Sequence, residues 1–194
     1  MKKAVIFDLN GVFILSPKLS DRFKDAYSIE PERFLPALND VMSHVRMPGA
    51  ESVYSYWQQY FVAWGLAISE EEFTTFWFTA ETENIEMVAL ARELRARGMR
   101  LFVLSNNLRE RSAYYDEHFP FLKELFEKQY YSWQTGFIKP DERCFTTVLS
   151  DNNLKPEDCI YFDDSAKNVT VAQSLGIESY VYEGADQVRK HTAK

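Results

Sequence analysis

Cysteine is scarce in this chain of 194 residues, which holds only Cys144 and Cys159. Their separation matches no metal-ligand spacing, and both lie in apolar contexts. We therefore expect two small buried thiols in a reducing compartment, which argues against a cysteine-ligated metal site or a disulfide-based scaffold. A disulfide between the two remains an open alternative without support in the sequence.

Net positive charge and long apolar runs are also missing. The formal net charge of −7 argues against the broad basic surface that nucleic-acid binding needs. No stretch approaches the ~20 apolar residues of a membrane span, and Asp8 interrupts the short run after Met1-Lys2-Lys3, unlike a signal peptide. We expect a cytoplasmic protein with no nucleic-acid and no membrane partner, although one local positive pocket can still bind a phosphorylated substrate.

Short apolar runs recur along the chain, with helical patterns between them. Strands are expected at residues 4–8, 101–104, 129–131, 160–162 and 177–181, and helices at 85–97, 141–150 and 166–175. Runs that are apolar on both faces are typical of buried parallel strands. This alternation predicts an α/β fold, a doubly wound parallel sheet of Rossmann-like type.

The region between residues 17 and 83 has a different pattern. It contains no recognisable strand and four amphipathic helical segments, at roughly 18–27, 31–45, 49–64 and 70–80. We expect a helical cap domain at 17–83, inserted after the first strand into a core domain formed by 1–16 and 84–194. Residues 183–194 are expected to form a short final helix or a frayed tail.

Aromatic residues are abundant, and several recur at helical spacing in the third cap segment. Trp57, Tyr60, Phe61 and Trp64 share one face at i, i+3, i+4 and i+7. The simpler interpretation is a hydrophobic core between cap helices. The alternative is that some of these rings line the substrate side of the cap.

Three polar residues lie near a predicted cap loop: His44, Arg46 and Glu51. They are either substrate contacts or solvated loop residues, and the sequence does not decide between the two. His118 and His191 have the pattern of surface residues. We assign no histidine to catalysis.

Polar side chains stand at or near the ends of several predicted strands. They are Asp8, the run Ser105-Asn106-Asn107, Lys139 before Pro140, and the pair Asp163-Asp164. Taken singly, each has a simpler explanation as a helix cap, a turn residue or a solvated side chain. Because ligands gather at the carboxyl ends of parallel strands, we expect the four to meet in one pocket. Pro140 is expected in the first turn of the next helix, which would hold Lys139 at the rim of the sheet.

The acid pair indicates a metal. Adjacent carboxylates repel one another unless a cation lies between them. Mg²⁺ prefers a few carboxylates, retained waters and a substrate phosphate, and a lysine and a hydroxyl balance the remaining phosphoryl oxygens. The pattern predicts a site for magnesium and phosphate.

Four motifs in this order resemble those of the haloacid dehalogenase superfamily. They are Asp8-Leu9-Asn10-Gly11-Val12, Leu104-Ser105-Asn106-Asn107, Ile138-Lys139-Pro140 and Phe162-Asp163-Asp164-Ser165-Ala166-Lys167-Asn168. Together with the insertion, the resemblance covers essentially the whole chain. It is strongest to the subgroup with a small helical cap, which includes sugar-phosphate phosphatases and the N-terminal phosphatase domain of soluble epoxide hydrolase. It implies a Mg²⁺-dependent phosphatase acting on a small phosphorylated metabolite, while a monomer and a homodimer both stay open.

The resemblance also implies roles for the strand-end residues. Asp8 would be the nucleophile that forms an aspartyl phosphate, and also a metal ligand. The backbone carbonyl of Asn10 and the side chain of Asp164 would be further Mg²⁺ ligands, with Asp163 in support. The phosphoryl group would be bound by Ser105, Asn106 and Lys139, of which Ser105 and Lys139 are also catalytic.

Position 10 departs from the pattern of the family's phosphatases. There an acid protonates the leaving alcohol and then activates water, whereas Asn10 has no titratable proton near neutral pH. Losing such a group costs about 10²–10⁴ in rate, while metal binding should survive.

Three explanations of Asn10 stay open: a natural enzyme that is slow or relays protons through water or a cap side chain, an engineered trap, and a catalytically impaired module that binds a phosphorylated ligand or partner. A 2-haloacid dehalogenase fits less well, because it needs no magnesium and would not favour the acid pair. A phosphomutase rests on fold analogy alone.

Overall fold

The computed structural model describes residues 2–193 and contains a five-stranded parallel sheet in the order β5-β4-β1-β6-β7. The strands are β1 (Ala4–Phe7), β4 (Arg100–Ser105), β5 (Lys128–Tyr131), β6 (Cys159–Asp163) and β7 (Glu178–Val181). Every neighbouring pair is parallel. The predicted α/β doubly wound sheet is thereby confirmed, and β1 lies at its centre.

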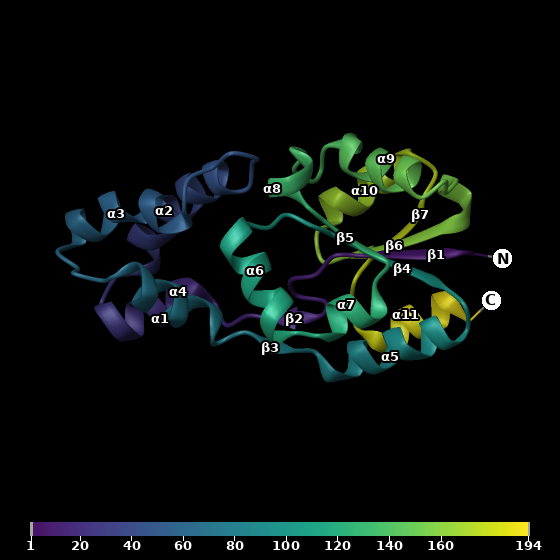
Figure 1. The fold of residues 1–194 in the computed structure, drawn as a ribbon, viewed down its shortest axis with the longest axis horizontal. Coiled ribbons are helices and arrows are strands. Elements are labelled where there is room, and N and C mark those ends of the chain that lie inside the picture. The colour runs from purple at the N-terminus through teal and green to yellow at the C-terminus, as the bar shows by residue number, and fades with distance from the viewer. Residues whose placement is uncertain (1, 194) are drawn as a thin grey trace.

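Helices cover both faces of the sheet (Figure 1). One face carries α5 (Ile85–Ala96), α7 (Phe121–Leu125) and α11 (Ala185–Thr192), and the other carries α9 (Glu142–Asp151) and α10 (Ala166–Ser174). Side chains of β1 alternate between the two layers, with Val5 and Phe7 in one core and Ala4 and Ile6 in the other. This burial on both sides explains why the strands are continuous apolar runs.

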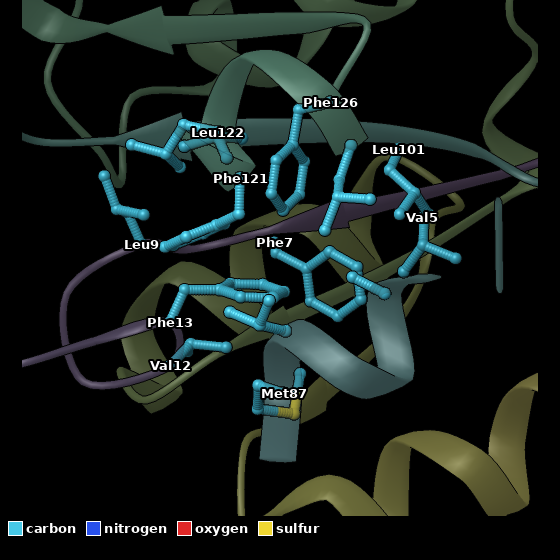
Figure 2. Packing of buried hydrophobic residues seen from close by; sticks show 14 of the residues in the cluster. Val5, Phe7, Leu9, Val12, Phe13, Met87, Leu101, Phe121, Leu122 and Phe126 are labelled. Carbon is cyan, nitrogen blue, oxygen red and sulfur yellow. The ribbon is translucent and has the colours of Figure 1, made fainter. Parts of the chain in front are cut away.

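The loop after β1 is held down by an aromatic cluster (Figure 2). The Phe13 ring meets Phe7 edge-on at 5.1 Å between centroids, and it meets Phe126 at the same distance. All three rings are buried. Edge-to-face aromatic pairs stabilise by about 0.5–1.5 kcal/mol beyond burial, so the segment around Asp8 is anchored on its apolar side.

The cap helices lie beyond one end of the sheet (Figure 1). They are α1 (Leu19–Tyr27), α2 (Pro31–Val45), α3 (Val53–Trp64) and α4 (Glu70–Phe78). Trp57 and Phe61 are buried among Phe23, Phe34 and Phe73. The interpretation of the aromatic stripe as cap core is therefore confirmed, whereas the domain boundaries at 16/17 and 83/84 stay a prediction.

Three local predictions were wrong. A two-residue strand, β3 (Thr82–Glu83), lies inside the region predicted to lack strands and pairs antiparallel with β2 (Ile14–Leu15). A strand of two residues is too short to show the alternation of apolar and polar residues that identifies a strand in a sequence. The third cap helix, expected from about residue 49, begins at Val53 because the Ser52 side chain caps it there. Pro140, expected in the first turn of the next helix, lies in a turn before it, and α9 begins at Glu142.

The remaining elements complete the chain. They are α6 (Arg109–His118), α8 (Ser132–Thr135) and the 3₁₀ turn Pro156–Asp158. Cys144 and Cys159 are both free and buried, as predicted. None of the helices formed by residues 2–193 has the length and apolar character needed to cross a bilayer.

Candidate active site

Most of the predicted strand-end residues line one cavity of about 400 Å³ at the carboxyl edge of the sheet, whereas Asn107 and Asp163 do not line it. Asp8 follows β1 directly, and its backbone N–H donates to the Phe162 carbonyl of β6 at 2.9 Å. Ser105 ends β4, and Asp164 follows β6. The lining also includes Asn10, Asn106 and Lys139, together with Arg46, Arg111, Pro140, Ser165, Lys167 and Asn168.

Lys139 connects Asp8, which follows β1, with Asp163, which ends β6. Its ammonium donates to Oδ1 of Asp8 at 2.8 Å and to Oδ2 of Asp163 at 2.6 Å, and its side chain is 2% exposed. Burial alone would lower the pKa of Lys139, but the charges of Asp8 and Asp163 outweigh it and raise that pKa. The lysine is therefore a permanent cation beside the Asp8 carboxylate.

Both carboxylate oxygens of Asp163 accept hydrogen bonds from neighbouring residues. It accepts hydrogen bonds from the Tyr161 hydroxyl, the Ser165 N–H at 2.8 Å and the Asn168 side chain at 3.0 Å, in addition to Lys139. Burial works to raise the pKa of Asp163, yet Lys139, the Tyr161 hydroxyl and the Ser165 N–H lower it overall. With its oxygens already accepting these bonds, Asp163 suits a supporting role to a metal better than direct ligation.

Asp8 and Asp164 are the less satisfied acids. Burial raises the pKa of Asp8 to about 6, against the opposing charge of Lys139. Burial, and then the charge of Asp163, raises the pKa of Asp164. Carboxylate oxygens of Asp8, Asp163 and Asp164 lie within 4.8 Å of one another. A cluster of hard oxygen donors at this spacing fits a divalent cation such as Mg²⁺.

Gly11 leaves room for this cluster. Its φ is +84°, and a Cβ there would lie 2.9 Å from Oδ2 of Asp164. Any larger residue would both strain the backbone and displace the carboxylate. The glycine after Asn10 is thus required by the turn and by the close approach of Asp164.

Asn106 positions Lys139. Its Oδ1 accepts the Lys139 backbone N–H at 2.8 Å, and its Nδ2 donates to the Lys139 carbonyl at 2.9 Å. The side-chain amide is therefore occupied by this reciprocal pair. A phosphate contact from Asn106 falls to its backbone N–H and stays a prediction, as does the contact from the Ser105 hydroxyl.

Asn10 is held by a buried tyrosine. Its Nδ2 donates to the Tyr115 hydroxyl at 2.7 Å, while its buried Oδ1 accepts no hydrogen bond from residues 2–193. Burial raises the pKa of Tyr115 well above its ordinary value. Neither member of the pair can exchange a proton near neutral pH.

Two arginines also line the cavity. The sequence left Arg46 undecided between a substrate contact and a solvated residue, and it gave no role to Arg111. Arg46 comes from the cap, directly after α2, and its pKa is lowered by burial and by the charge of Arg111. Arg111 lies on α6 and is ion-paired with buried Glu81. The Nε atoms of both are buried without a partner in the described part of the chain.

Arg111 was missed in the sequence for a physical reason. Arg111 stands in the run Arg109-Glu110-Arg111, which looks like a solvated helix face, and only its i, i+4 spacing to Tyr115 hints at burial. Of the other residues weighed, His44 stacks on Tyr56, and neither it nor Glu51 lines this cavity.

Comparison with solved structures supports the fold. A haloacid dehalogenase (HAD) family enzyme of Bacteroides thetaiotaomicron superposes with a TM-score of 0.85 at 23% identity, covering 100% of this chain and 99% of that one. That enzyme was also crystallised with magnesium and with magnesium plus inorganic phosphate.

Curated relatives match over shorter stretches. D-ribitol-5-phosphate phosphatase of B. thetaiotaomicron is 32% identical over 66 residues, which is 34% of this chain and 32% of that protein. Phosphatase MT3486 of Mycobacterium tuberculosis is 30% identical over 97 residues, or 50% of this chain and 45% of that protein. Among the relatives compared, the matched segments cover 8% to 45% of their own lengths.

The family model described as haloacid dehalogenase-like hydrolase matches residues 2–176. That span contains the cap, four of the five strands of the sheet and every residue that lines the cavity. The chain belongs to the haloacid dehalogenase-like hydrolases.

Proposed function

We propose that this hydrolase is a Mg²⁺-dependent phosphatase that acts on a small phosphorylated metabolite through an aspartyl phosphate on Asp8. The observation that carries the proposal is the buried ammonium of Lys139, held between Asp8 and Asp163 beside the open carboxylate of Asp164. Fixed positive charge next to a carboxylate nucleophile is what phosphoryl transfer needs. The phosphatase relatives favour the same chemistry.

The oxygen cluster would hold the magnesium. Asp8, Asp164 and the backbone carbonyl of Asn10 are the proposed ligands, with Asp163 in support. When bound, the ion supplies positive charge for the phosphoryl oxygens and offsets the crowding of acids. The magnesium complexes of the Bacteroides enzyme are consistent with this choice.

The chain's own residues then divide the work. One carboxylate oxygen of Asp8 attacks phosphorus, while Lys139 neutralises charge on the nucleophile and on the phosphoryl group. Ser105 donates a hydrogen bond to a phosphoryl oxygen. Arg46 brings a guanidinium from the cap to the same cavity, so the cap contributes to anion binding and excludes water when it closes over substrate.

The cavity also limits the substrate. It measures about 400 Å³, and Pro140 is the one apolar residue among its described lining residues. The aromatic side chains of the cap pack in the cap's own core. A compact, hydrophilic phosphate ester fits this lining better than a nucleotide or a lipid phosphate.

Phosphate release from a panel of phosphorylated metabolites tests the proposal, with Mg²⁺ and with EDTA. We expect release that requires Mg²⁺ and disappears in Asp8→Asn. An absence of release from every ester, in both the native chain and Asn10→Asp, would contradict phosphatase function.

Asn10 supports a second candidate, a module that binds a phosphorylated ligand without turning it over. In that case Mg²⁺-dependent phosphate binding is retained while Asn10→Asp adds no rate. A dehalogenase is the weaker alternative, because it gives no role to Asp164; halide release from a 2-halo acid would revive it.

A further inference from the structure

Building on the proposed phosphatase function, we propose that this site accepts phosphoryl groups from donors whose leaving group departs as a stable anion. Acyl, enol and anomeric phosphates share that chemistry. The same geometry leaves the phosphorylated Asp8 long-lived, so the chain works as a slow phosphatase with a persistent phosphoenzyme.

The first observation concerns the amide of Asn10. Asn10 lines the cavity, but its Nδ2 is taken by the Tyr115 hydroxyl at 2.7 Å. The group left for a ligand is Oδ1, which is buried and has no partner in residues 2–193. A carbonyl oxygen accepts hydrogen bonds and has no proton to give. It can orient a hydroxyl or a water, but it cannot protonate a leaving oxygen.

The second observation is that no other described lining residue replaces the missing acid. Lys139 is held by two carboxylates, and the guanidinium groups of Arg46 and Arg111 do not release protons in proteins. Asp8 is the nucleophile, and Asp164 is a proposed metal ligand. No histidine among residues 2–193 lines the cavity.

Lys167 is the remaining candidate, and it is weak. It lies on the first turn of α10, three residues after Asp164, and is exposed to solvent. A strongly hydrated ammonium on a flexible stem is poorly placed for positioned proton transfer. Lys167→Met therefore serves as a direct check.

The transfer step follows from these constraints. A bond forms between a carboxylate oxygen of Asp8 and phosphorus, while the bond from phosphorus to the leaving oxygen breaks. The electron pair departs with the leaving oxygen, which takes no proton from the protein. A carboxylate or an enolate bears that charge readily, and an anomeric oxygen bears it better than a primary alkoxide because the adjacent ring oxygen withdraws electrons.

The second step is slow for the same reason. A water oxygen bonds to phosphorus, the bond to Asp8 breaks, and the surplus proton passes to solvent or to the released phosphate. General acid–base help for such a step is usually worth about 10²–10⁴ in rate. Without that help, phosphorylated Asp8 is hydrolysed more slowly than it forms, so the phosphoenzyme accumulates.

Aryl phosphates with phenols of graded acidity test the first step. We expect kcat/KM to rise steeply with the acidity of the phenol while kcat stays constant, with a burst of one phenol per protein. In Asn10→Asp the dependence should flatten, chiefly through a gain of tenfold or more for the least acidic phenol. Lys167→Met should keep the steep dependence.

Acetyl phosphate and the pair glucose 1-phosphate and glucose 6-phosphate separate the donor classes. We expect kcat/KM for the anomeric ester to exceed that for the primary ester at least tenfold, and Asn10→Asp to shrink the ratio. Reaction with acetyl phosphate but not glucose 1-phosphate would remove anomeric phosphates from the proposed donors.

Acid quenching followed by peptide mass spectrometry tests the persistence. We expect one phosphoryl group on Asp8 in most molecules at steady state, and little in Asn10→Asp. A shallow leaving-group dependence in the native chain that steepens in Lys167→Met would show that Lys167 is the acid, and it would overturn the inference while leaving phosphatase function intact. An unmodified Asp8 during turnover would do the same. Absence of reaction with every donor in both chains would instead overturn the proposed function itself.

Discussion

Lys139 is the residue that makes a cluster of buried acids tolerable. Its ammonium contacts Asp8 and Asp163, and both Lys139 and Asp163 side chains are almost fully shielded from water. A buried ion pair adds little net stability compared with an apolar pair, but removing one partner leaves an unpaired buried charge. The lysine therefore matters to folding as well as to chemistry.

Replacing Lys139 by methionine should destabilise the metal-free protein by about 3–5 kcal/mol, because two buried carboxylates lose their counter-charge. Urea unfolding in EDTA measures this. Lys128→Met is the matched control, since Lys128 forms an exposed pair with Asp151 and such pairs are worth about 0–1 kcal/mol. Equal losses in the two variants would contradict the account.

Arg46 carries the second prediction at this scale. Because its guanidinium lines the cavity and its Nε has no partner among residues 2–193, Arg46→Gln should weaken inorganic phosphate binding about tenfold, the value of one charge-assisted contact. Isothermal titration in Mg²⁺ measures the affinity, and the exposed Arg92 gives the control Arg92→Gln. Unchanged affinity in Arg46→Gln would remove the cap arginine from the site.

At the scale of elements, long buried patterns were predictable and short or packing-dependent ones were not. The runs that became β1, β4 and β6 are apolar on both faces, so sequence alone indicates a buried parallel sheet. β2 and β3 are two residues each and carry no period. Their pairing depends on where the chain enters and leaves the cap, which local sequence does not encode.

The site residues also fall into those that the sequence could predict and those that it could not. Asp8, Ser105 and Asp163 were predictable because a strand end fixes the direction of each side chain toward one edge. Arg46, directly after α2, and Arg111, on α6, are placed by helices whose orientation to the sheet is set by tertiary packing. The engagement of Asn106 with Lys139 was likewise hidden, because it depends on two loops that meet only in the folded chain.

The cap core gives a prediction for one helix. Trp57 is fully buried in α3 among Phe23, Phe34 and Phe61, so Trp57→Ala should cost about 3–5 kcal/mol through the lost contacts and the cavity left behind. Thermal or urea unfolding measures it. Val62→Ala on the same helix, at a side chain 80% exposed, should change stability by less than ~0.5 kcal/mol. A small loss in Trp57→Ala would indicate that the cap core is loosely packed.

At the scale of the whole molecule, the acid cluster links stability, pH and metal. Burial raises the pKa of Asp8 from 3.8 to about 6, so the folded metal-free protein holds that proton more tightly than the unfolded chain does. The resulting stabilisation is present below pH 3.8 and is lost as the pH rises through about 6.

Magnesium should reverse this trend, because it binds the deprotonated carboxylate. We expect the Mg²⁺ affinity to fall about tenfold between pH 7 and pH 5, as protons compete for Asp8. Titration calorimetry across this range measures it, with proton release from buffers of different ionisation enthalpy as an internal check. An affinity independent of pH would show that Asp8 does not contact the ion.

We infer that Asp8 and Asp164 share one divalent cation at the carboxyl edge of the sheet. A crystal grown with Mn²⁺ and inorganic phosphate, with anomalous scattering recorded, tests it most directly. We expect one strong peak between the two carboxylates, with the phosphate beside Ser105 and Lys139. An ion bound elsewhere, or none at all near Asp164, would contradict it.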